Sequence, residues 1–319
     1  MTCSTQPASA LSSRIDVYSP CEHPHPGQVG NVLSRAFTAA GHKVTIVSRN
    51  HSPTYANLAE LIETTDVVIN LAGRSVNCRY SPANRKAIID SRTITTKAIS
   101  QAIQNATKPP KTWLQMSTAT IYAHRYDAPN DEATGILGTL HDDVPETWRF
   151  SHDVALTRER TAQEIETPHT RKVFLRTSLV LSPDRGGVFD VLLTLVRRGL
   201  GGTNGNGRQY ISWIHDADFI RAVNLLMERT DLDGPVNLAA PNPLPNREFM
   251  TALRKAAKMP FGLSATEWML ELGALFLRTE TELILKSRRV IPGRLLTAGF
   301  QFQYPDWPAA VRDLFERWK

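Results

Sequence analysis

Two glycines near the N-terminus have a spacing that can bring the peptide backbone close to a phosphate group. Gly27 and Gly30 follow a predicted strand at residues 14–18 and precede apolar residues at helical spacing. Glycine has no Cβ, so the N–H groups at the start of the helix can approach an anion. A dinucleotide-binding turn has a third glycine upstream, but three residues before Gly27 the chain has Pro24. The stretch therefore predicts an irregular dinucleotide-binding turn.

Ser48 and Arg49 follow the next predicted strand, at residues 43–47, which is rich in β-branched side chains. At about this distance from the glycine turn, dinucleotide-binding domains contact the ribose of the adenosine. An acidic residue there suits NAD, whereas an arginine offers charge and a planar set of donors to the 2′-phosphate of NADP. We therefore expect NADP rather than NAD, with a solvated surface side chain as the alternative for Arg49.

Small and polar residues also follow two further predicted strands. The run after the buried strand that starts at residue 66 is Asn70, Leu71, Ala72 and Gly73. The strand at residues 112–116 precedes a run rich in hydroxyl groups that includes Thr118. Because open α/β sheets bind ligands outside the carboxyl ends of their strands, we expect both runs at a binding crevice. A turn that merely contains hydroxyl groups is the alternative for the second run.

Strands that alternate with helices must position these residues. Helical periodicity occurs at residues 31–40, 82–106 and 148–166, each between predicted strands. This alternation predicts an α/β fold with a Rossmann-like, doubly wound parallel sheet. We assign residues 1–182 to this dinucleotide-binding domain, with residues 1–13 as a loose tail.

The remainder of the chain, residues 183–319, is mostly helical and predicts a smaller substrate-binding lobe. Extended segments near residues 210–239 are expected to return to the main sheet. The C-terminal lobe should therefore be partly interleaved with the first domain.

Composition and charge argue against several classes of function. The net charge is +6, but no basic run is interleaved with aromatic residues, so no nucleic-acid partner is expected. No segment predicts a membrane span or a secretion signal. The three scattered cysteines suit a reducing cytoplasm, and Cys21, His23 and His25 lack the second ligand pair of a metal site. A small ligand that bears phosphate fits the modest positive charge, and the oligomeric state stays open.

Together these motifs resemble the extended short-chain dehydrogenase/reductase superfamily. Other segments resemble one branch of it, the atypical "epimerase family" proteins with a C-terminal domain of unknown function. The resemblance covers the chain from about residue 43 to the C-terminus. The segments that carry this second resemblance are residues 78–80 (CRY), 85–86 (RK), 91–92 (SR), 207–215 (GRQYISWIH), 234–238 (GPVNL) and 298–302 (AGFQF).

The resemblance implies a set of cofactor contacts and a substrate class. The implied cofactor is NADP(H), held by Gly27, Gly30, Ser48, Arg49, Asn70, Leu71, Ala72, Gly73 and Arg92. Thr118 takes the place of the superfamily's active-site hydroxyl, which orients the substrate oxygen. The implied substrate is a small alcohol or carbonyl compound, such as a sugar derivative.

The resemblance fails at the residues that usually transfer the proton. Glu159 matches a glutamate late in the superfamily's active-site helix. Counting back from it, the catalytic tyrosine falls on Ser151 and the catalytic lysine on Ala155. In the superfamily, the lysine cation lowers the pKa of the tyrosine, which can then act as acid and base. Neither Ser151 nor Ala155 can do this at neutral pH.

Other residues are candidates for the missing acid and base. Tyr122 lies close to Thr118 in the chain, and His152 lies on the active-site helix and titrates in a suitable range. His124 and Glu132 follow in a long polar loop. The alternatives are packing over the cofactor for Tyr122 and a surface position for His152.

Four residues are expected on the substrate side: Arg176, Gln209, Trp213 and His215. Arg176 follows a strand and could bind an anionic group, with a salt bridge inside the fold as the alternative. For Trp213 the alternative is packing between the lobes, and for His215 it is capping or packing.

Two functions are compatible with these residues. The first is an NADP(H)-dependent oxidoreductase or epimerase-like enzyme, in which Thr118 positions the oxygen and Tyr122 or His152 moves the proton. The second is a catalytically impaired nucleotide-binding protein with a sensing or structural role, which Ser151 and Ala155 favour.

Overall fold

The computed structural model describes residues 12–19, 27–48, 57–139, 144–266, 268–269 and 282–318. Its centre is a six-stranded sheet in the order β2-β1-β3-β4-β5-β9, in which all neighbouring strands are parallel. The strands are β1 (Arg14–Ser19), β2 (Lys43–Ser48), β3 (Val67–Asn70), β4 (Thr112–Thr118), β5 (Arg171–Thr177) and β9 (Gly234–Leu238). This topology confirms the predicted Rossmann-like, doubly wound fold.

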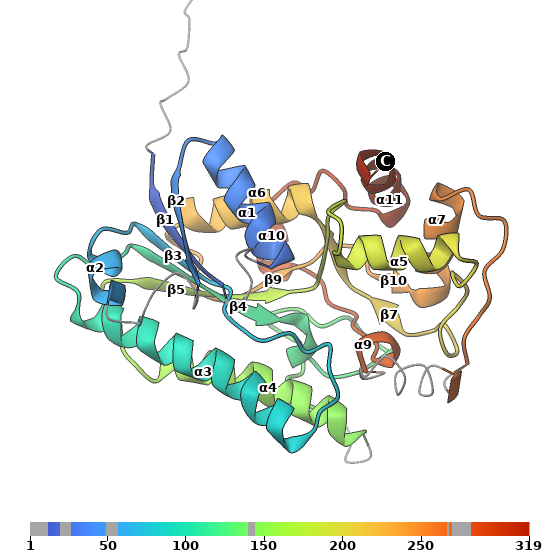
Figure 1. Ribbon diagram of the computed structural model, residues 1–319, viewed down its shortest axis with the longest axis horizontal. Coiled ribbons are helices and arrows are strands. Elements are labelled where there is room, and N and C mark those ends of the chain that lie inside the picture. Colours follow the sequence, from blue (N-terminus) through green and yellow to red (C-terminus); the bar gives the residue numbers. More distant parts are fainter. Residues whose placement is uncertain are drawn as a thin grey trace, which may run out of the picture.

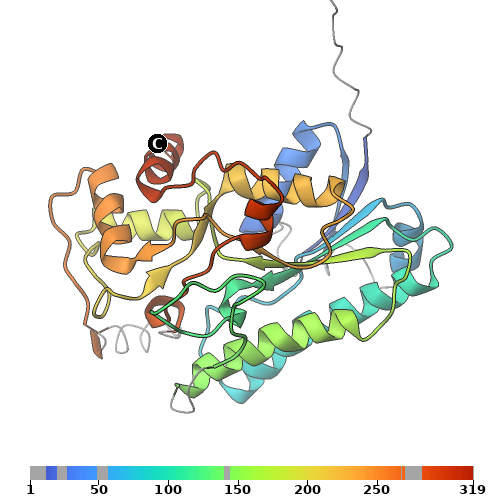
Figure 2. The same cartoon turned by 180° about the vertical axis from the view of Figure 1, so that it is seen from behind.

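Helices cover both faces of this sheet, as Figures 1 and 2 show from opposite sides. On one face lie α1 (Gln28–Ala39), α6 (Asp216–Glu228) and α10 (Gly293–Thr297). On the other lie α2 (Leu58–Glu63), α3 (Pro82–Asn105) and α4 (Glu146–Gln163). Two helical layers require strands that are apolar on both sides.

The strand sequences meet this requirement. In β3, Ile69 packs in the cluster that contains α1 and α6, whereas its neighbour Val68 packs in the cluster that contains α2 and α3. In β4, Leu114 and Trp113 divide between the two faces in the same way. Because successive side chains of a strand point to opposite faces, a continuous apolar run buries both layers at once.

The direction of winding changes next to β1. The connection through α1 places β2 on one side of β1, whereas β3 lies on the other side. Tyr18 of β1 is level with Asn70 of β3, so both strands end at the same edge of the sheet. In open α/β sheets the crevice for the ligand forms at such a switch point.

The C-terminal lobe is built around aromatic residues. Its two small sheets pair β6 (Leu179–Leu181) with β8 (Trp213–His215) and β7 (Tyr210–Ile211) with β10 (Leu244–Pro245). Its helices are α5 (Val188–Arg197), α7 (Asn246–Ala256), the short α9 (Glu282–Leu285) and α11 (Trp307–Trp318). In its core the rings of Phe249 and Trp307 stack at 4.2 Å, and Trp213 lies 5.1 Å from Trp307.

The two parts of the chain share elements. The strand β9 belongs to the main sheet, and α6 and α10 pack in the hydrophobic cluster on one of its faces, although all three follow α5 in sequence. The lobe therefore cannot separate from the sheet as an independent body without exposing part of that cluster. Within the described ranges, no helix is both long and apolar enough to cross a membrane.

Truncation of Trp307 to alanine should destabilise the whole fold. Trp307 is 1% exposed and contacts two other rings, so removal leaves a large cavity that costs about 3–5 kcal/mol of unfolding free energy. Urea denaturation followed by tryptophan fluorescence and circular dichroism measures this loss. Trp268→Ala is the matched control, because that side chain is 66% exposed and its loss should cost less than about 0.5 kcal/mol. Equal losses in both variants would contradict the proposed core.

Candidate functional site

The loop after β3 is held by Asn70, which is fully buried. Its amide donates to Gln115 Oε1 at 2.9 Å and to Thr96 Oγ1 at 3.2 Å, and its Oδ1 accepts from the Ala72 N–H at 3.0 Å. All of these partners belong to the protein. Asn70 therefore fixes the start of the loop after β3 from inside the protein, and the residues that follow Asn70 form the surface of the crevice.

Gly73 brings this loop into contact with Arg92 of α3. A Cβ built on Gly73 would lie 3.1 Å from Cζ of the Arg92 guanidinium, which is a tight contact. The guanidinium donates to the Ile88 carbonyl at 2.9 Å and to the Arg74 carbonyl at 3.1 Å. A side chain at position 73 would therefore push against the guanidinium of Arg92, whereas glycine leaves room for it.

A cavity of about 240 Å³ lies at the carboxyl ends of β3 and β4. Helices α3 and α4 form its walls, and α9 of the C-terminal lobe contributes one residue. Residues on its wall include Leu71, Gly73, Arg92, Thr118, Ser151, Ala155, Arg158 and Glu282. The structure thus brings together residues that were predicted separately. They are the run after β3, the hydroxyl of Thr118 at the end of β4, and the positions of the missing tyrosine and lysine.

Thr118 ends β4 with its hydroxyl on the cavity wall. Its Oγ1 accepts a hydrogen bond from the Thr120 N–H at 3.2 Å. This bond uses a lone pair of the hydroxyl and leaves its proton able to point toward a bound oxygen. The geometry is compatible with the orienting role that the resemblance implies.

Ser151 is hydrogen-bonded to an acidic residue from the other lobe. Its hydroxyl donates to Glu282 Oε2 at 2.5 Å, and both side chains line the cavity. Glu282 is 1% exposed, and its other oxygen lies 3.4 Å from Arg288 Nη2 and 3.8 Å from Lys286 Nζ. The sequence did not indicate Glu282 as a site residue, because no local pattern connects it with a position 131 residues earlier.

Lys286 is buried next to this pair. Its Nζ donates to the Thr120 carbonyl at 2.9 Å and lies 2.9 Å from His152 Nε2. Burial lowers the pKa of Lys286 to about 7, although the carboxylate of Glu282 opposes the shift. An amine that is half charged near neutral pH is thus placed beside the cavity.

His152 supports this lysine and does not line the cavity. Burial, together with the charge of Lys286, lowers its pKa to about 3, so the ring is neutral at physiological pH. Nδ1 lies 3.1 Å from the Ile121 carbonyl and must carry the proton, which leaves Nε2 to accept from Lys286. Both ring nitrogens are therefore occupied, and neither the expected acid–base role nor the surface alternative fits this position.

Tyr122 and Arg176 belong to a buried network behind the cavity. The Tyr122 hydroxyl donates to Asn237 Oδ1 at 2.9 Å and accepts from Arg176 Nη1 at 3.0 Å. Arg176 binds both carboxylate oxygens of Glu159, at 3.0 and 2.8 Å. Burial raises the pKa of Tyr122. These contacts correspond to the salt-bridge alternative for Arg176, and they engage the Tyr122 hydroxyl within the protein.

The remaining expected substrate residues lie in the C-terminal lobe, away from the cavity wall. Gln209 and Trp213 are buried, and Trp213 is part of the aromatic core. His215 caps α6 by accepting from the Ala217 N–H at 3.1 Å, and its Nε2 lies 2.9 Å from Asp313 Oδ2. Packing and capping, the alternatives to substrate contact, describe these positions.

The residues expected to hold the cofactor phosphates lie at the start of α1 and the end of β2. Gly27 is the N-cap of α1 and offers no side-chain acceptor, so the first N–H groups of the helix suit an anion. Gly30 is buried within the helix. Ser48 ends β2, whereas its side chain, Arg49 and the turn with Cys21, His23 and His25 lie outside the described residues.

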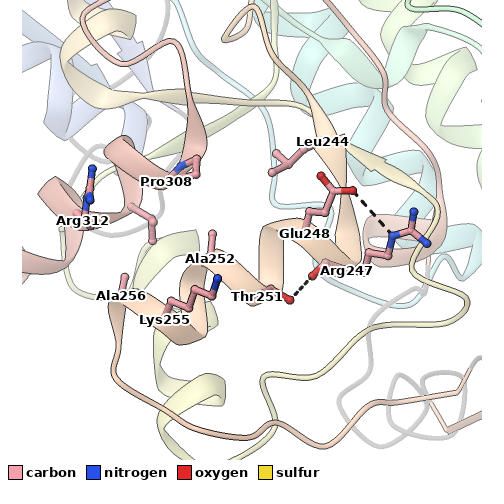
Figure 3. A pocket seen from close by; sticks show the side chains of 10 residues that line it. Leu244, Arg247, Glu248, Thr251, Ala252, Lys255, Ala256, Pro308 and Arg312 are labelled. Carbon is pink, nitrogen blue, oxygen red and sulfur yellow. Dashed lines mark hydrogen bonds and ion pairs between the residues drawn. The ribbon is translucent and has the colours of Figure 1, made fainter.

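A larger hollow of about 600 Å³ lies between α7 and α11 in the C-terminal lobe (Figure 3). Arg247, Glu248, Lys255 and Arg312 line it around an apolar floor, and Glu248 pairs with Arg247 at 3.9 Å. None of the expected site residues lines it. We place the candidate site in the smaller cavity because that cavity contains the buried hydroxyl, carboxylate and guanidinium groups.

Substitution of Lys286 by methionine should remove a pH dependence of stability. Between the folded pKa of about 7 and the unfolded value near 10.4, the unfolded chain binds more protons than the folded chain. Stability of the wild type relative to Lys286→Met should therefore rise with pH across this window and become independent of pH below it. Urea unfolding at several pH values measures the difference. Lys255→Met, at an exposed lysine, should follow the wild type, and parallel curves for wild type and Lys286→Met would contradict the assignment.

Several proteins are similar to this chain over nearly its full length. The human "epimerase family protein SDR39U1" is 29% identical over 299 residues, which cover 90% of this chain and 96% of that protein. "Epimerase family protein YfhF" of Bacillus subtilis is 30% identical over 303 residues, covering 90% and 95%.

Solved structures share the fold. A crystal structure of human SDR39U1 (isoform 2) with NADPH superposes with a TM-score of 0.83 at 29% identity, covering 95% of this chain and 99% of that chain. A nucleoside-diphosphate sugar epimerase from Corynebacterium glutamicum superposes with a TM-score of 0.72 at 24% identity, covering 96% of this chain and 59% of the other.

Family models divide the chain into two matched regions. Residues 265–314 match a domain of unknown function, DUF1731. Residues 25–239, which include most of the main sheet and the cavity wall, match the NAD dependent epimerase/dehydratase family. This match, the six-stranded parallel sheet and a relative that is 30% identical over 90% of the chain show that the chain belongs to the NAD dependent epimerase/dehydratase family.

Proposed function

We propose that the protein is an NADP(H)-dependent oxidoreductase or epimerase-like enzyme that acts on a small, polar alcohol or carbonyl compound. The observation that carries the proposal is the cavity at the carboxyl end of the sheet, where Thr118 and the Ser151–Glu282 pair share one wall. A positioned hydroxyl and a carboxylate reached through a second hydroxyl are the groups that proton transfer at an alcohol needs.

Two observations support NADP(H) as the cofactor. The human relative that superposes with a TM-score of 0.83 was crystallised with NADPH. In this chain, Gly27 leaves the first turn of α1 without a side-chain cap, which suits a pyrophosphate. Arg49 would hold the 2′-phosphate, and the loop at Gly73 would lie along the nicotinamide end. When bound, NADP(H) supplies or accepts the hydride.

The chain's own residues would handle the oxygen and its proton. The Thr118 hydroxyl accepts from the Thr120 N–H and can donate to the substrate oxygen. During oxidation of an alcohol, the substrate proton would pass to Ser151 Oγ while the Ser151 proton passes to Glu282 Oε2. Lys286 Nζ and Arg288 Nη2 lie 3.8 and 3.4 Å from the other oxygen of Glu282, which fixes the position of this carboxylate.

A catalytically impaired nucleotide-binding protein is the second candidate. It is favoured by the absence of the usual tyrosine and lysine at Ser151 and Ala155, and by the protein contacts that occupy both Tyr122 and His152. In that case the cavity would bind the cofactor without turnover, and the Ser151–Glu282 bond would serve only to join α4 to the C-terminal lobe.

Replacement of Arg49 by alanine should remove the preference for NADPH over NADH. Loss of a charge-assisted contact with the 2′-phosphate is expected to weaken NADPH roughly tenfold or more and to leave NADH unchanged. Titration of nicotinamide fluorescence with both cofactors measures the preference. Arg160→Ala, at an exposed arginine of α4, is the control. An unchanged preference in Arg49→Ala would show that another residue reads the phosphate.

Replacement of Glu282 by glutamine should impair turnover more than cofactor binding. Glu282 accepts the proton in alcohol oxidation and returns it in carbonyl reduction, so its loss is expected to lower kcat about 10²–10⁴-fold in an NADPH oxidation assay across a panel of carbonyl compounds. Ser151→Ala should lower kcat in the same direction, and Glu146→Gln, at an exposed carboxylate of α4, should not. Wild-type rates in Glu282→Gln would rule out the relay. Binding of NADPH without turnover on any compound, unaffected by Thr118→Ala, would favour the second candidate.

A further inference from the structure

Helix α4 presents two different rows of side chains to the cavity. Ser151, Ala155 and Arg158 form the first row, and Phe150 and Val154 form the second. Residues three or four positions apart lie on the same side of a helix, so each row runs along the helix axis. The first row carries a hydroxyl and a cation, whereas the second row is entirely apolar.

The two ends of the cavity lie apart along this helix. Arg158 donates to the carbonyls of Asn70 and Ala72, at 3.2 and 2.8 Å, and therefore lies beside the loop after β3. Phe150 precedes Arg158 by eight residues, which corresponds to roughly 12 Å along the axis of an α-helix. The cofactor is expected at the Arg158 end, because the loop with Gly73 would lie along its nicotinamide. The end at Phe150 is left for the substrate.

A second aromatic ring completes the apolar end of the cavity. Tyr80 lies in the segment before α3, and its ring centre is 4.9 Å from that of Phe150, with an interplanar angle of 65°. Val76, from the loop after β3, packs in the same cluster, which also contains Val154. We call the four residues that line the cavity here the apolar wall: Val76, Tyr80, Phe150 and Val154.

Arg85 holds the two rings of the apolar wall without lining the cavity itself. Its Cζ lies 4.7 Å from the centre of the Phe150 ring and 5.9 Å from that of the Tyr80 ring. Its Nε donates to the Tyr80 carbonyl at 2.7 Å, and its guanidinium is paired with Glu146. The rings are therefore held in place by protein contacts and need no ligand to position them.

We infer that the apolar wall is a subsite for a flat, apolar group of the substrate, such as an aromatic ring. The inference rests on the proposed function, because it names a substrate class for the same cavity. Ser151 follows Phe150 directly in the helix, and its hydroxyl donates to Glu282. The reacting oxygen would lie at Ser151 and Thr118, and the carbon skeleton would extend from this oxygen along the apolar wall. The polarity of the substrate is then confined to its reacting end.

The apolar wall favours an apolar group over the hydroxyl groups of a sugar. An apolar ring that leaves water for this wall is stabilised by the hydrophobic effect and by contacts with the two aromatic rings. A sugar can also stack on an aromatic ring, but it carries a hydroxyl on nearly every carbon atom. Against Val76 and Val154 these hydroxyls would lose hydrogen bonds to water without a replacement. The substrate class is therefore an aryl or alkyl alcohol or carbonyl compound.

Saturation-transfer NMR titrations of the full chain, saturated with NADPH, test the subsite. Benzyl alcohol and erythritol are the probes, because they have the same number of non-hydrogen atoms and NADPH cannot reduce either of them. Benzyl alcohol should bind with a roughly millimolar dissociation constant, and erythritol should bind at least about tenfold more weakly. Val76→Phe fills the space beside the apolar wall and should weaken benzyl alcohol at least about tenfold. Val191→Phe, at a valine of α5 that is 53% exposed and outside the cavity, should bind as the wild type does.

Three results would overturn the inference: no binding of benzyl alcohol, equal affinities for the two alcohols, or an unchanged affinity for benzyl alcohol in Val76→Phe. If circular dichroism shows that Val76→Phe does not fold, Phe150→Leu carries the same test from α4, because it removes one ring and keeps the site apolar. If benzyl alcohol binds at the apolar wall but NADPH does not bind, or benzaldehyde is not reduced, the subsite stands and the proposed function fails.

Discussion

Buried polar contacts fix the rotation of helix α4 about its own axis, and the candidate site depends on this constraint. Ser151 bonds to Glu282 of α9, and His152 accepts from Lys286. Farther along α4, Arg158 donates to a carbonyl of the loop after β3, and the next residue, Glu159, binds the guanidinium of Arg176 in β5. A shift by one residue would place charged groups against apolar surface, where each unpaired charge costs several kcal/mol.

The same contacts join the two parts of the chain. Glu282 and Lys286 reach α4 from a segment that follows the entire main sheet in sequence. The acidic group of the site is therefore supplied by the C-terminal lobe rather than by the nucleotide-binding domain. In the superfamily that the motifs resemble, both members of the proton-transferring dyad come from one helix. Here that helix contributes a serine, and the carboxylate comes from elsewhere.

Both signs of charge occur on the wall of the cavity. The guanidinium groups of Arg92 and Arg158 line it together with the carboxylate of Glu282, which is hydrogen-bonded to Ser151. Charged groups on a cavity wall orient a polar ligand by electrostatics before any close contact forms.

The sequence by itself determined the architecture and the edge of the sheet at which the site lies. The apolar runs in β3 and β4 predicted a sheet buried on both faces, and the small residues at the ends of these strands predicted the crevice. Both features could be predicted because each depends only on residues that are close together in the sequence. Thr118 and the run from Asn70 to Gly73 were found in this way, whereas Ser151 was placed by the family resemblance. Only the tertiary structure decided which polar side chains face the cavity. The side chains of Tyr122, His152 and Arg176 form hydrogen bonds within the protein. Glu282 and Arg158 line the cavity, and Lys286 lies next to it. The direction of a buried side chain depends on partners that are far away in the chain, and no local spacing encodes those partners.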